Sequence, residues 1–459
     1  MSTSPTQPPP GPHGAENANN GSDTQLDIAV IGGGIVGLMI SLGLLHRNMR
    51  VTIYERAPAF NDFSTGFAFT GIARQCMQRL SPHIVDALRR VNDWPHHEYY
   101  RYWDGHTPDT KEAALMFRMP SRELDYCSCV RSQFLRGMLD RLPEGVLRYG
   151  KQLVSYVDEE GSGKVVLSFA DGTEAEADVV VGCDGIHSRT RQILLGEDKP
   201  EAYAGFTHKV AYRGVVPIEG VIAALGEDKA DNQCSHMGPN GHVVNNSTHS
   251  NIVAFLHDPT PWPSPSLPSS SSSSPKLTTP GTRTEIQQAL ASWSPSVRAL
   301  VALLPERLSK WAIFDMADHP APTYARGRVV IAGDAAHASC PFHGLGACMG
   351  VEDALAIATA LEVAWGEVGG GGVGIGIGRA VTEALQAASK VRLGRTQWMT
   401  QSLREMGEIY QWRYAPTGRD AEKIRAEFDY RSRVAWDFDV DKMVEETKTE
   451  CERRLKLAS

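Results

Sequence analysis

The 459-residue sequence predicts an α/β fold, and three separated glycine-bearing segments support this class. They span residues 32–37 (Gly-Gly-Gly-Ile-Val-Gly), 182–185 (Gly-Cys-Asp-Gly) and 333–337 (Gly-Asp-Ala-Ala-His). Each segment follows a run of apolar residues that is typical of a buried strand, and the first leads directly into an apolar stretch that is typical of a helix. Strand–turn–helix units of this kind are the building blocks of α/β domains.

Length and composition favour two closely packed lobes, because 459 residues exceed a usual single core. Hydrophobic residues make up 42% of the chain and charged residues 22%, which is an ordinary soluble composition. The net charge of −8 indicates no nucleic-acid partner. The N-terminal residues lack a basic segment followed by an apolar core, and the charged C-terminal residues offer no span. We therefore expect a cytoplasmic protein with no secretory signal and no membrane span.

The eight cysteines are scattered along the chain, and only Cys127 and Cys129 lie close together. No second pair and no histidines at zinc spacing accompany them. We expect reduced packing residues and no metal site.

The first glycine segment has the spacing of a dinucleotide-binding turn. It follows the expected strand Asp27–Ile31 and precedes an apolar stretch, 38–45, that is expected to be helical. Gly32 permits the tight turn, Gly34 lets the backbone approach a pyrophosphate, and Gly37 lets the helix pack on the strand. The N–H groups at the N-terminus of such a helix attract phosphates.

An acidic residue stands where this interpretation requires one. Glu55 comes about twenty residues after the glycines and follows a second expected strand, Arg50–Tyr54. A carboxylate at that place binds ribose hydroxyls. The alternative is a glycine-rich turn that binds no ligand.

The three motifs, in this order and at this spacing, resemble the class A FAD-dependent aromatic monooxygenases, whose fold is that of 4-hydroxybenzoate hydroxylase. The resemblance extends from residue 26 to the C-terminus. Further segments are similar to the salicylate hydroxylase-like enzymes of fungal aromatic-polyketide pathways; they are 212–214, 225–229, 258–263, 311–315 and 436–441. The resemblance implies non-covalent FAD, NADPH or NADH as co-substrate, O2, and hydroxylation or oxidative dearomatisation of a phenolic substrate.

The resemblance also implies a division of the chain into a Rossmann-like FAD-binding domain, a β-sheet substrate domain and a helical C-terminal region. The expected parts are a disordered N-terminus (1–25), the first part of the FAD-binding domain (26–200), the substrate domain (201–325) with a Ser/Pro loop at 263–281, the second part of the FAD-binding domain (326–365), and the helical region (366–459). The oligomeric state is left open.

Four residues match positions at which relatives approach FAD. Asp334 corresponds to the aspartate that meets the ribityl hydroxyls, although a helix N-cap is the alternative role. The backbone at Gly346 and Ala347 is expected to approach the ring. Arg131 matches an arginine near the phosphates and ribose, and a surface arginine is its alternative.

Two further positions are more ambiguous. Asp184 and Arg189 match a motif linked to both FAD and nicotinamide binding, but an Asp-Gly turn is also plain structure. Ala68 stands where relatives usually have glycine. An alanine should be tolerated there, with a less assured approach of the backbone to the flavin.

Arg213, on an expected strand at 211–215, is the candidate catalytic residue. A cationic group facing a phenol favours the phenolate by roughly one to three pKa units. The phenolate has more electron density at its ortho and para carbons, which the oxygen attacks. A structural arginine bound to backbone carbonyls is the alternative.

The neighbouring polar residues leave the substrate open. Phenol-dearomatising relatives often place a tyrosine where this chain has Asn246, which suggests a different substrate, although Asn246 could still hydrogen-bond an oxygen. His242 and His249 are weak general-base candidates. For His337 and His343 we expect structural hydrogen bonds, with acid–base work as the alternative.

Rival functions on the same fold are a flavin-dependent halogenase and an epoxidase. We find no halogenase tunnel motif and no C-terminal span of the kind that terpenoid epoxidases carry. A flavin-binding redox-responsive protein without turnover is the rival from another class. The polar strand around Asn246 is the one feature in favour of that rival.

Overall fold

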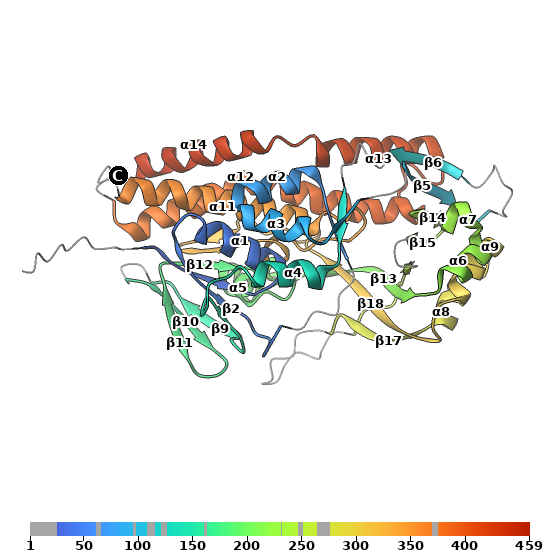
Figure 1. Cartoon of the computed structure of the whole chain (residues 1–459), viewed down its shortest axis with the longest axis horizontal. Coiled ribbons are helices and arrows are strands. Elements are labelled where there is room, and N and C mark those ends of the chain that lie inside the picture. The colour runs from blue at the N-terminus through green and yellow to red at the C-terminus, as the bar shows by residue number, and fades with distance from the viewer. Residues whose placement is uncertain are drawn as a thin grey trace, which may run out of the picture.

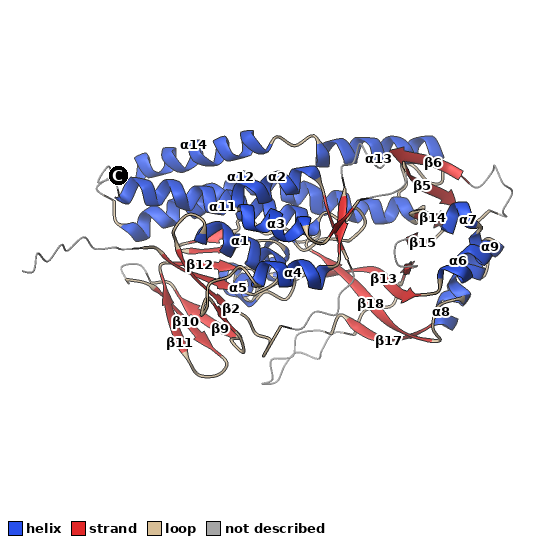
Figure 2. Cartoon of the chain, viewed as in Figure 1, coloured by secondary structure: helices blue, strands red, loops and turns tan. Residues whose placement is uncertain are grey.

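The computed structural model describes residues 25–60, 66–94, 98–107, 115–120, 126–159, 163–230, 232–246, 251–263, 276–369 and 375–459. It has the mixed α/β architecture that the sequence predicts (Figure 1). The predicted disordered N-terminus lies outside the described residues except for Gln25, and so does most of the Ser/Pro tract. Long helices run along one side of the molecule, and large parts of the sheets lie on the other (Figure 2).

The first sheet is the nucleotide-binding sheet expected from the glycine motifs. Within the described residues its strand order is β19-β20-β12-β1-β2-β8. The strands are β1 (Asp27–Ile31), β2 (Arg50–Tyr54), β8 (Leu147–Arg148), β12 (Val179–Gly182), β19 (Ala325–Arg326) and β20 (Val329–Ile331). All neighbours pair in parallel except β19 with β20. Both faces are covered, which explains why β1, β12 and β20 are nearly continuous apolar runs.

Helices cover one face of the nucleotide-binding sheet, and a helix with a small β-meander covers the other. One face packs against α1 (Ile35–Leu45), α2 (Gly71–Leu80) and α11 (Gly346–Gly369), whose apolar residues share a core with alternate residues of β1 and β12. The other face packs against α5 (Arg189–Leu195) and a meander of β9 (Leu153–Val157), β10 (Val165–Phe169) and β11 (Glu174–Ala177). Val165, Leu167 and Phe169 of β10 are buried in this core, and the residues between them are more exposed.

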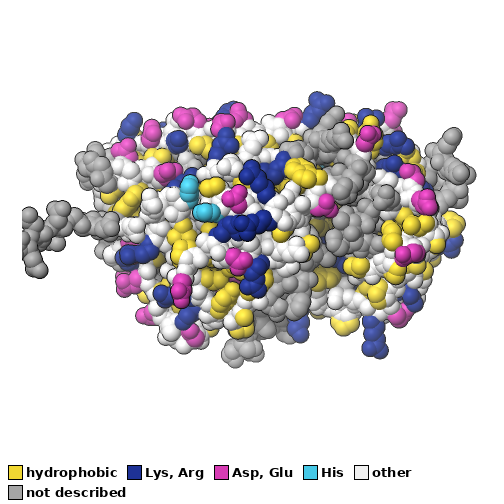
Figure 3. Space-filling view, in the orientation of Figure 1, with side chains coloured by type: hydrophobic (Ala, Val, Ile, Leu, Met, Phe, Trp, Pro, Cys, Tyr) yellow, Lys and Arg dark blue, Asp and Glu magenta, His cyan; other side chains and the backbone are white. Residues whose placement is uncertain are grey.

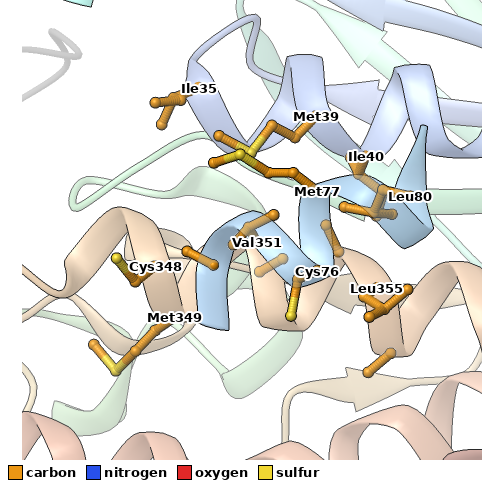
Figure 4. Close-up of a cluster of buried hydrophobic side chains, with 14 of the residues drawn as sticks. Ile35, Met39, Ile40, Cys76, Met77, Leu80, Cys348, Met349, Val351 and Leu355 are labelled. Carbon is orange, nitrogen blue, oxygen red and sulfur yellow. The ribbon is translucent and has the colours of Figure 1, made fainter. Parts of the chain in front are cut away.

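Figure 4 shows how α1, α2 and α11 meet in this core. Met39 of α1 lies against Met77 of α2, and Val351 of α11 closes the cluster from the other side. All three side chains are at most 1% exposed. Flexible methionines suit a junction of three helices because they fill irregular gaps.

The second large sheet carries the expected substrate lobe. Its order in the described part is β17-β18-β13-β16-β15-β14-β5-β6. The strands are β5 (Tyr99–Asp104), β6 (Leu115–Pro120), β13 (Gly205–Val215), β14 (Cys234–Gly238), β15 (Gly241–Asn246), β16 (Asn251–His257), β17 (Thr278–Thr282) and β18 (Arg307–Asp315). One face packs against α6 (Ile218–Leu225), α8 (Arg283–Ala289) and α9 (Pro295–Ala302).

The structure corrects the predicted division at two places. Strands β5 and β6, which the sequence assigns to the FAD-binding domain, pair with β14 and so belong to the substrate sheet. Residues 278–281, which the sequence assigns to the Ser/Pro loop, lie in β17 and pair with β18. In both places pairing with a strand distant in the chain decides the structure, and local composition does not report such pairing.

The remaining elements join the two large sheets. A small sheet is formed by β3 (Phe67–Phe69), β7 (Cys127–Cys129) and β4 (Asn92–Asp93), and short helices are α3 (Pro82–Arg89), α4 (Arg131–Leu139), α7 (Glu227–Ala230), α10 (Asp334–His337) and the 3-10 turn η1 (Pro200–Ala202). The C-terminal helices α12 (Ile377–Tyr410), α13 (Ala421–Trp436) and α14 (Val440–Ala458) extend over both lobes (Figure 1).

The surface carries mixed charge. On the face drawn in Figure 3, acidic and basic side chains are interspersed. No described helix is long and apolar enough to cross a membrane.

Candidate functional site

The three glycine motifs meet at one edge of the nucleotide-binding sheet. Strands β20, β12 and β1 are neighbours and run in parallel, so the residues that follow them lie at the same edge. These residues are Gly32 after β1, Cys183 and Asp184 after β12, and Gly333 after β20. Ligands of open α/β sheets bind at this carboxyl edge.

The three glycine positions of the first motif, 32, 34 and 37, differ in why they require or allow glycine. Gly32 has φ +103°, a conformation that other residues adopt rarely, and a Cβ there would lie 2.5 Å from the Cys183 carbonyl oxygen. A Cβ at Gly37 would lie 2.0 Å from the Gly32 carbonyl oxygen. At Gly34 no described atom beyond its chain neighbours lies within 4 Å of a Cβ position. Gly32 and Gly37 therefore shape the turn, whereas Gly34 borders open space.

The N-terminus of α1 is available to an anion. Gly34 is its N-cap, and no described side chain caps the helix. The Glu55 carboxylate lies beside this turn, where it accepts hydrogen bonds from the Gly33 N–H (2.7 Å) and the Ala57 N–H (2.8 Å). Each carboxylate oxygen has a second lone pair, so Glu55 can still accept a ribose hydroxyl.

Asp334 lies where the third motif turns into α10. Its carboxylate is accessible to solvent, yet surrounding protein buries it enough to raise its pKa, while His337, Arg131 and Arg191 act in the opposite direction. A Cβ at Gly346 would lie 3.9 Å from Asp334 Oδ1, so the start of α11 borders this carboxylate. The structure thus brings together Asp334, Gly346 and the charge of Arg131.

The other predicted cofactor residues adjoin the same place. The Arg131 guanidinium lies 5.2 Å from the centre of the Phe67 ring, in β3. Ala68 follows Phe67, and its carbonyl oxygen lies 3.8 Å from the Cys348 Sγ in the first turn of α11. Ala68 and Ala347 therefore lie close in space, although they are far apart in the sequence.

The structure gives Asp184 and Arg189 structural partners. Asp184 accepts from the Ser188 hydroxyl (2.5 Å) and from the Thr190 N–H (3.0 Å), and so stabilises the start of α5. Arg189 bonds to the Val154 carbonyl (2.7 Å) and forms an ion pair with Glu197 (2.8 Å). Neither contact leads toward Asp334.

The arginine that does reach Asp334 is Arg191, to which the sequence analysis assigned no role. It is 1% exposed and donates to the carbonyls of Ala335 (3.0 Å) and Asp334 (3.4 Å). Burial lowers its pKa to about 10, and Asp184 and Asp334 oppose that change. An arginine three residues past a capping serine was the available signal, but spacing alone did not distinguish it from Arg189.

These features fit a dinucleotide. The uncapped helix and the space at Gly34 suit a pyrophosphate, Glu55 suits a ribose, and Asp334 is an accessible acceptor for hydroxyl groups. In the described residues no group of three or more His, Cys, Asp or Glu could hold a metal ion.

Arg213 lies on the substrate sheet, on the face turned toward this edge. It is opposite Val253, and two residues from Ala211, which is opposite Phe255. Ala211, Val253 and Phe255 belong to the core that includes the nucleotide-binding helices, whereas Tyr212 packs on the opposite face. The Arg213 side chain reaches solvent-accessible space, and the protein around it lowers its pKa through burial.

An aromatic stack connects that face with the loop after Asp334. The ring of His242 lies between Phe255 (4.5 Å between centroids) and Tyr410 of α12 (4.6 Å), and Phe342 meets it edge-on (5.4 Å). Burial lowers the pKa of His242 to about 3, and the charge of Lys209 adds to this. His242 is therefore neutral at physiological pH.

The remaining polar candidates differ in position. Asn246 lies in β15 opposite Asn251, on the same face as Arg213 by register. His249 lies outside the described residues. His343 precedes the start of α11, and its carbonyl accepts from the Tyr126 hydroxyl (2.5 Å).

Two family models match parts of the chain. A FAD-dependent oxidoreductase model matches residues 27–118, and a FAD binding domain model matches residues 266–373. The two matches contain the first and the third glycine motif.

Curated relatives match nearly the whole chain. A FAD-dependent monooxygenase of Aspergillus terreus is 49% identical over 439 residues, with 94% of this chain and 98% of the relative covered. The monooxygenase pigN of Monascus ruber, also named FAD-dependent, is 42% identical, with 94% and 98% covered. The salicylate hydroxylase asL1 of Sarocladium schorii is 39% identical, with 94% and 92% covered.

A solved structure shares both the fold and detectable sequence. A salicylate hydroxylase in complex with its substrate superposes with a TM-score of 0.77 at 28% identity, with 93% of this chain and 98% of that chain covered. The flavoprotein CtdE in complex with FAD, at 19% identity and a TM-score of 0.62, shares the fold.

Proposed function

The chain belongs to the FAD-dependent monooxygenases, and we propose that it inserts one oxygen atom of O2 into a phenolic ring with NADPH or NADH as reductant. In balanced form, a ring C–H, O2, NAD(P)H and a proton give a ring C–OH, water and NAD(P)+. The substrate is a salicylate- or resorcinol-like phenol, to be sought among the aromatic polyketides of secondary metabolism. Salicylate hydroxylases among the similar proteins support this class.

The observation that carries the proposal is the place of Arg213. It lies on the face of the substrate sheet that packs, through Phe255 and His242, against Phe342. Phe342 is eight residues after Asp334, in the loop that leads to α11. A phenol bound over Arg213 would therefore lie between the substrate sheet and the expected flavin site.

We assign the cofactor-binding roles residue by residue. Gly34 and the N-terminus of α1 face the pyrophosphate, Glu55 faces a ribose, and Asp334 accepts from ribityl hydroxyls. Gly32 and Gly37 shape the turn beside this helix, and Asp184 stabilises the start of α5 at the same edge. The other assigned residues are Ala68, Arg131, Gly346 and Ala347. Bound FAD would supply the activation of oxygen, and the protein supplies position, charge and exclusion of water.

Arg213 performs the step that belongs to the protein. Its guanidinium favours loss of the phenol proton and orients the resulting phenolate by a charge-assisted hydrogen bond. Val253 lies opposite Arg213, and Val244 lies opposite Val253 on the next strand, so the two apolar residues offer a surface for the ring. Where oxygen enters at a substituted carbon, the product is a dearomatised dienone or, from a carboxylated carbon, a phenol formed with loss of CO2.

The proposal is tested with a panel of substituted salicylates and resorcinols. NAD(P)H consumption is followed by absorbance, and products are identified by mass spectrometry. We expect at least one phenol to stimulate NAD(P)H consumption and to gain one oxygen atom. Stimulation by none of them, or consumption that yields only hydrogen peroxide with every phenol, would contradict the proposal.

A further inference from the structure

Asp353 forms a buried hydrogen-bond centre behind the expected flavin site. Its carboxylate is in α11 and is 3% exposed. Oδ2 accepts from the Gly333 N–H (3.0 Å) and from His337 Nε2 (2.5 Å), and Oδ1 accepts from Arg392 Nε (2.9 Å). Burial acts to raise the pKa of Asp353, but His337 and Arg392 outweigh it and hold the pKa below its usual value. The carboxylate is therefore ionised, and Nε2 of His337 is the donor.

The turn that Asp353 holds is the one that presents Asp334. Gly333 has φ +60° and immediately precedes Asp334, so its N–H points into the protein while the next residue faces the open edge. On the other side of Asp334, Arg191 donates to its carbonyl and to that of Ala335. The backbone of Asp334 is thus held from before and after by two buried charged residues.

His337 has only one of its ring nitrogens engaged. Its Nδ1 is buried and has no hydrogen-bond partner among the described residues. The ring lines a cavity of about 190 Å³, together with Tyr324, Gln397 and Thr400. Because Nδ1 is not fixed by protein, the bond from Nε2 to Asp353 is the polar contact that sets the ring's orientation.

The network around Asp353 continues through its neighbour Glu352 to the C-terminal helices. Arg392 also forms an ion pair with Glu352 (2.8 Å), and Glu352 forms one with Arg395 (2.8 Å). Arg395 donates to the carbonyls of Val434 (3.0 Å) and Ala435 (3.2 Å) in α13. This outer end contacts neither Gly333 nor Asp334, and so provides a matched control.

We propose that His337 and Asp353 are positioning residues of the flavin site. Asp353 fixes the Gly333–Asp334 turn, and His337 fixes Asp353, so that the Asp334 carboxylate is presented to the ribityl hydroxyls before FAD arrives. The inference rests on the proposed role of Asp334. It does not depend on the phenolic substrate, because flavin binding is measured without turnover.

Two amide substitutions separate this role from general stability. In His337→Gln the side-chain amide can reach the place of Nε2 and donate to Asp353, whereas in His337→Asn it reaches only the place of Nδ1. Both variants keep a polar amide in the same buried site. Arg395→Met breaks the ion pair with Glu352 at the outer end of the network.

FAD dissociation constants are measured by the quenching of flavin fluorescence, with the absorption spectrum of the bound flavin as second readout. We expect His337→Asn to weaken FAD binding by roughly tenfold or more and to shift the spectrum. His337→Gln should restore binding to within about threefold of wild type, and Arg395→Met should bind FAD normally even if its melting temperature falls. Equal FAD affinity in the two amide variants, or equal loss in Arg395→Met and His337→Asn, would overturn the proposal.

If neither amide variant folds, the FAD affinity and flavin spectrum of Asp353→Asn test the same positioning role. Gly333 and His337 both donate to Oδ2, and Arg392 donates to Oδ1. An asparagine amide therefore turns its nitrogen either toward Arg392 or toward Gly333 and His337, and in both orientations a donor faces a buried donor. Weaker FAD binding with a shifted spectrum would support the positioning role. FAD binding like that of the wild type in Asp353→Asn would overturn it.

Discussion

At the scale of single residues, the glycines of the first motif separate folding from binding. A side chain at Gly34 would enter open space at the edge of the sheet, whereas a side chain at Gly37 would collide with the Gly32 carbonyl oxygen. We predict that Gly34→Val keeps the melting temperature of the apoprotein but loses most FAD. Gly37→Ala should lower that melting temperature itself. Flavin content and thermal unfolding of the two apoproteins check this, and full FAD content in Gly34→Val would contradict it.

Arg213 allows a test of the proposed phenolate anchor. Arg213→Ala should lower hydroxylation by about a hundredfold, since a lost charge-assisted hydrogen bond costs roughly 2–3 kcal/mol and each 1.4 kcal/mol is a factor of ten. Arg213→Lys keeps the charge but not the planar fork, and should lie between alanine and wild type. FAD content should stay unchanged in both.

Product formed per NAD(P)H consumed, measured from pH 6 to 9, distinguishes charge from packing at Arg213. Rising pH should partly rescue Arg213→Ala, because solvent hydroxide then produces the phenolate. Wild-type coupling in Arg213→Ala would show that the anchor lies elsewhere, with Asn246 the next residue to substitute.

His242 makes stability depend on pH in a predictable direction. Its pKa is about 3 in the folded protein and near 6.5 in the unfolded chain, so the unfolded chain binds more protons below pH 6.5. The contribution of neutral His242 to the free energy of unfolding is therefore complete above pH 6.5 and is lost as pH falls toward 3. At pH 5 the loss is about 2 kcal/mol. In His242→Phe, whose ring fits between Phe255 and Tyr410, this loss should disappear.

Chemical unfolding at pH 7.5 and pH 5.0 measures the effect of His242. The difference between the two free energies of unfolding should be smaller in His242→Phe than in wild type by about 2 kcal/mol. His83 is exposed, and His83→Gln serves as the control that should keep the wild-type difference. An unchanged pH dependence in His242→Phe would contradict the account.

At the scale of elements, an ion pair between a buried lysine and a partly exposed glutamate connects β13 to α12. Lys209 is 1% exposed, and its ammonium pairs with Glu408, which also pairs with Arg413. Removing one partner of a buried pair leaves a charge with poor solvation. We predict that Glu408→Gln lowers the free energy of unfolding by about 3 kcal/mol, because it leaves the buried ammonium of Lys209 unpaired, and that adding Lys209→Met recovers part of it. Chemical unfolding of both variants checks this, and a stable single variant would contradict it.

The sequence was most informative where one element determines its own structure. The apolar run of β1 and the glycines after it predicted the strand, the turn and the helix, because local sterics decide all three. The start of α11 at Gly346 was harder to predict, since glycines at a helix start carry little propensity signal. The pairing of β5 and β6 with β14 could not be predicted, because a distant strand decides it.

The candidate site was predictable to a similar extent. Residues in local motifs, such as Gly34 and Asp334, could be named from spacing. Asp353 could not, because its partners Gly333 and Arg392 are 20 and 39 residues away, and an acidic residue in an amphipathic helix usually faces solvent. The acidic pair Glu352–Asp353, which an apolar stretch follows from 354 to 361, was the available signal.

At the scale of the whole molecule, α12 holds the two lobes in one arrangement. Near its middle, Ser389 Oγ accepts from the Tyr324 N–H (2.9 Å) beside the nucleotide-binding sheet. At its end, Tyr410 stacks on His242 of the substrate sheet. With 34 residues the helix is about 50 Å long, so it contacts both lobes. The distance between the Arg213 face and the Asp334 edge is therefore set by a rigid element.

The central claim is that the chain transfers oxygen from O2 to a phenolic ring. It is tested most directly by turnover under ¹⁸O2 in ordinary water, with a phenol that stimulates NAD(P)H consumption. We predict a product that carries one ¹⁸O atom, with formation suppressed in Asp334→Ala, which should lose FAD. A product whose new oxygen comes from water, or an unlabelled phenol recovered after NAD(P)H has been consumed, would contradict the claim.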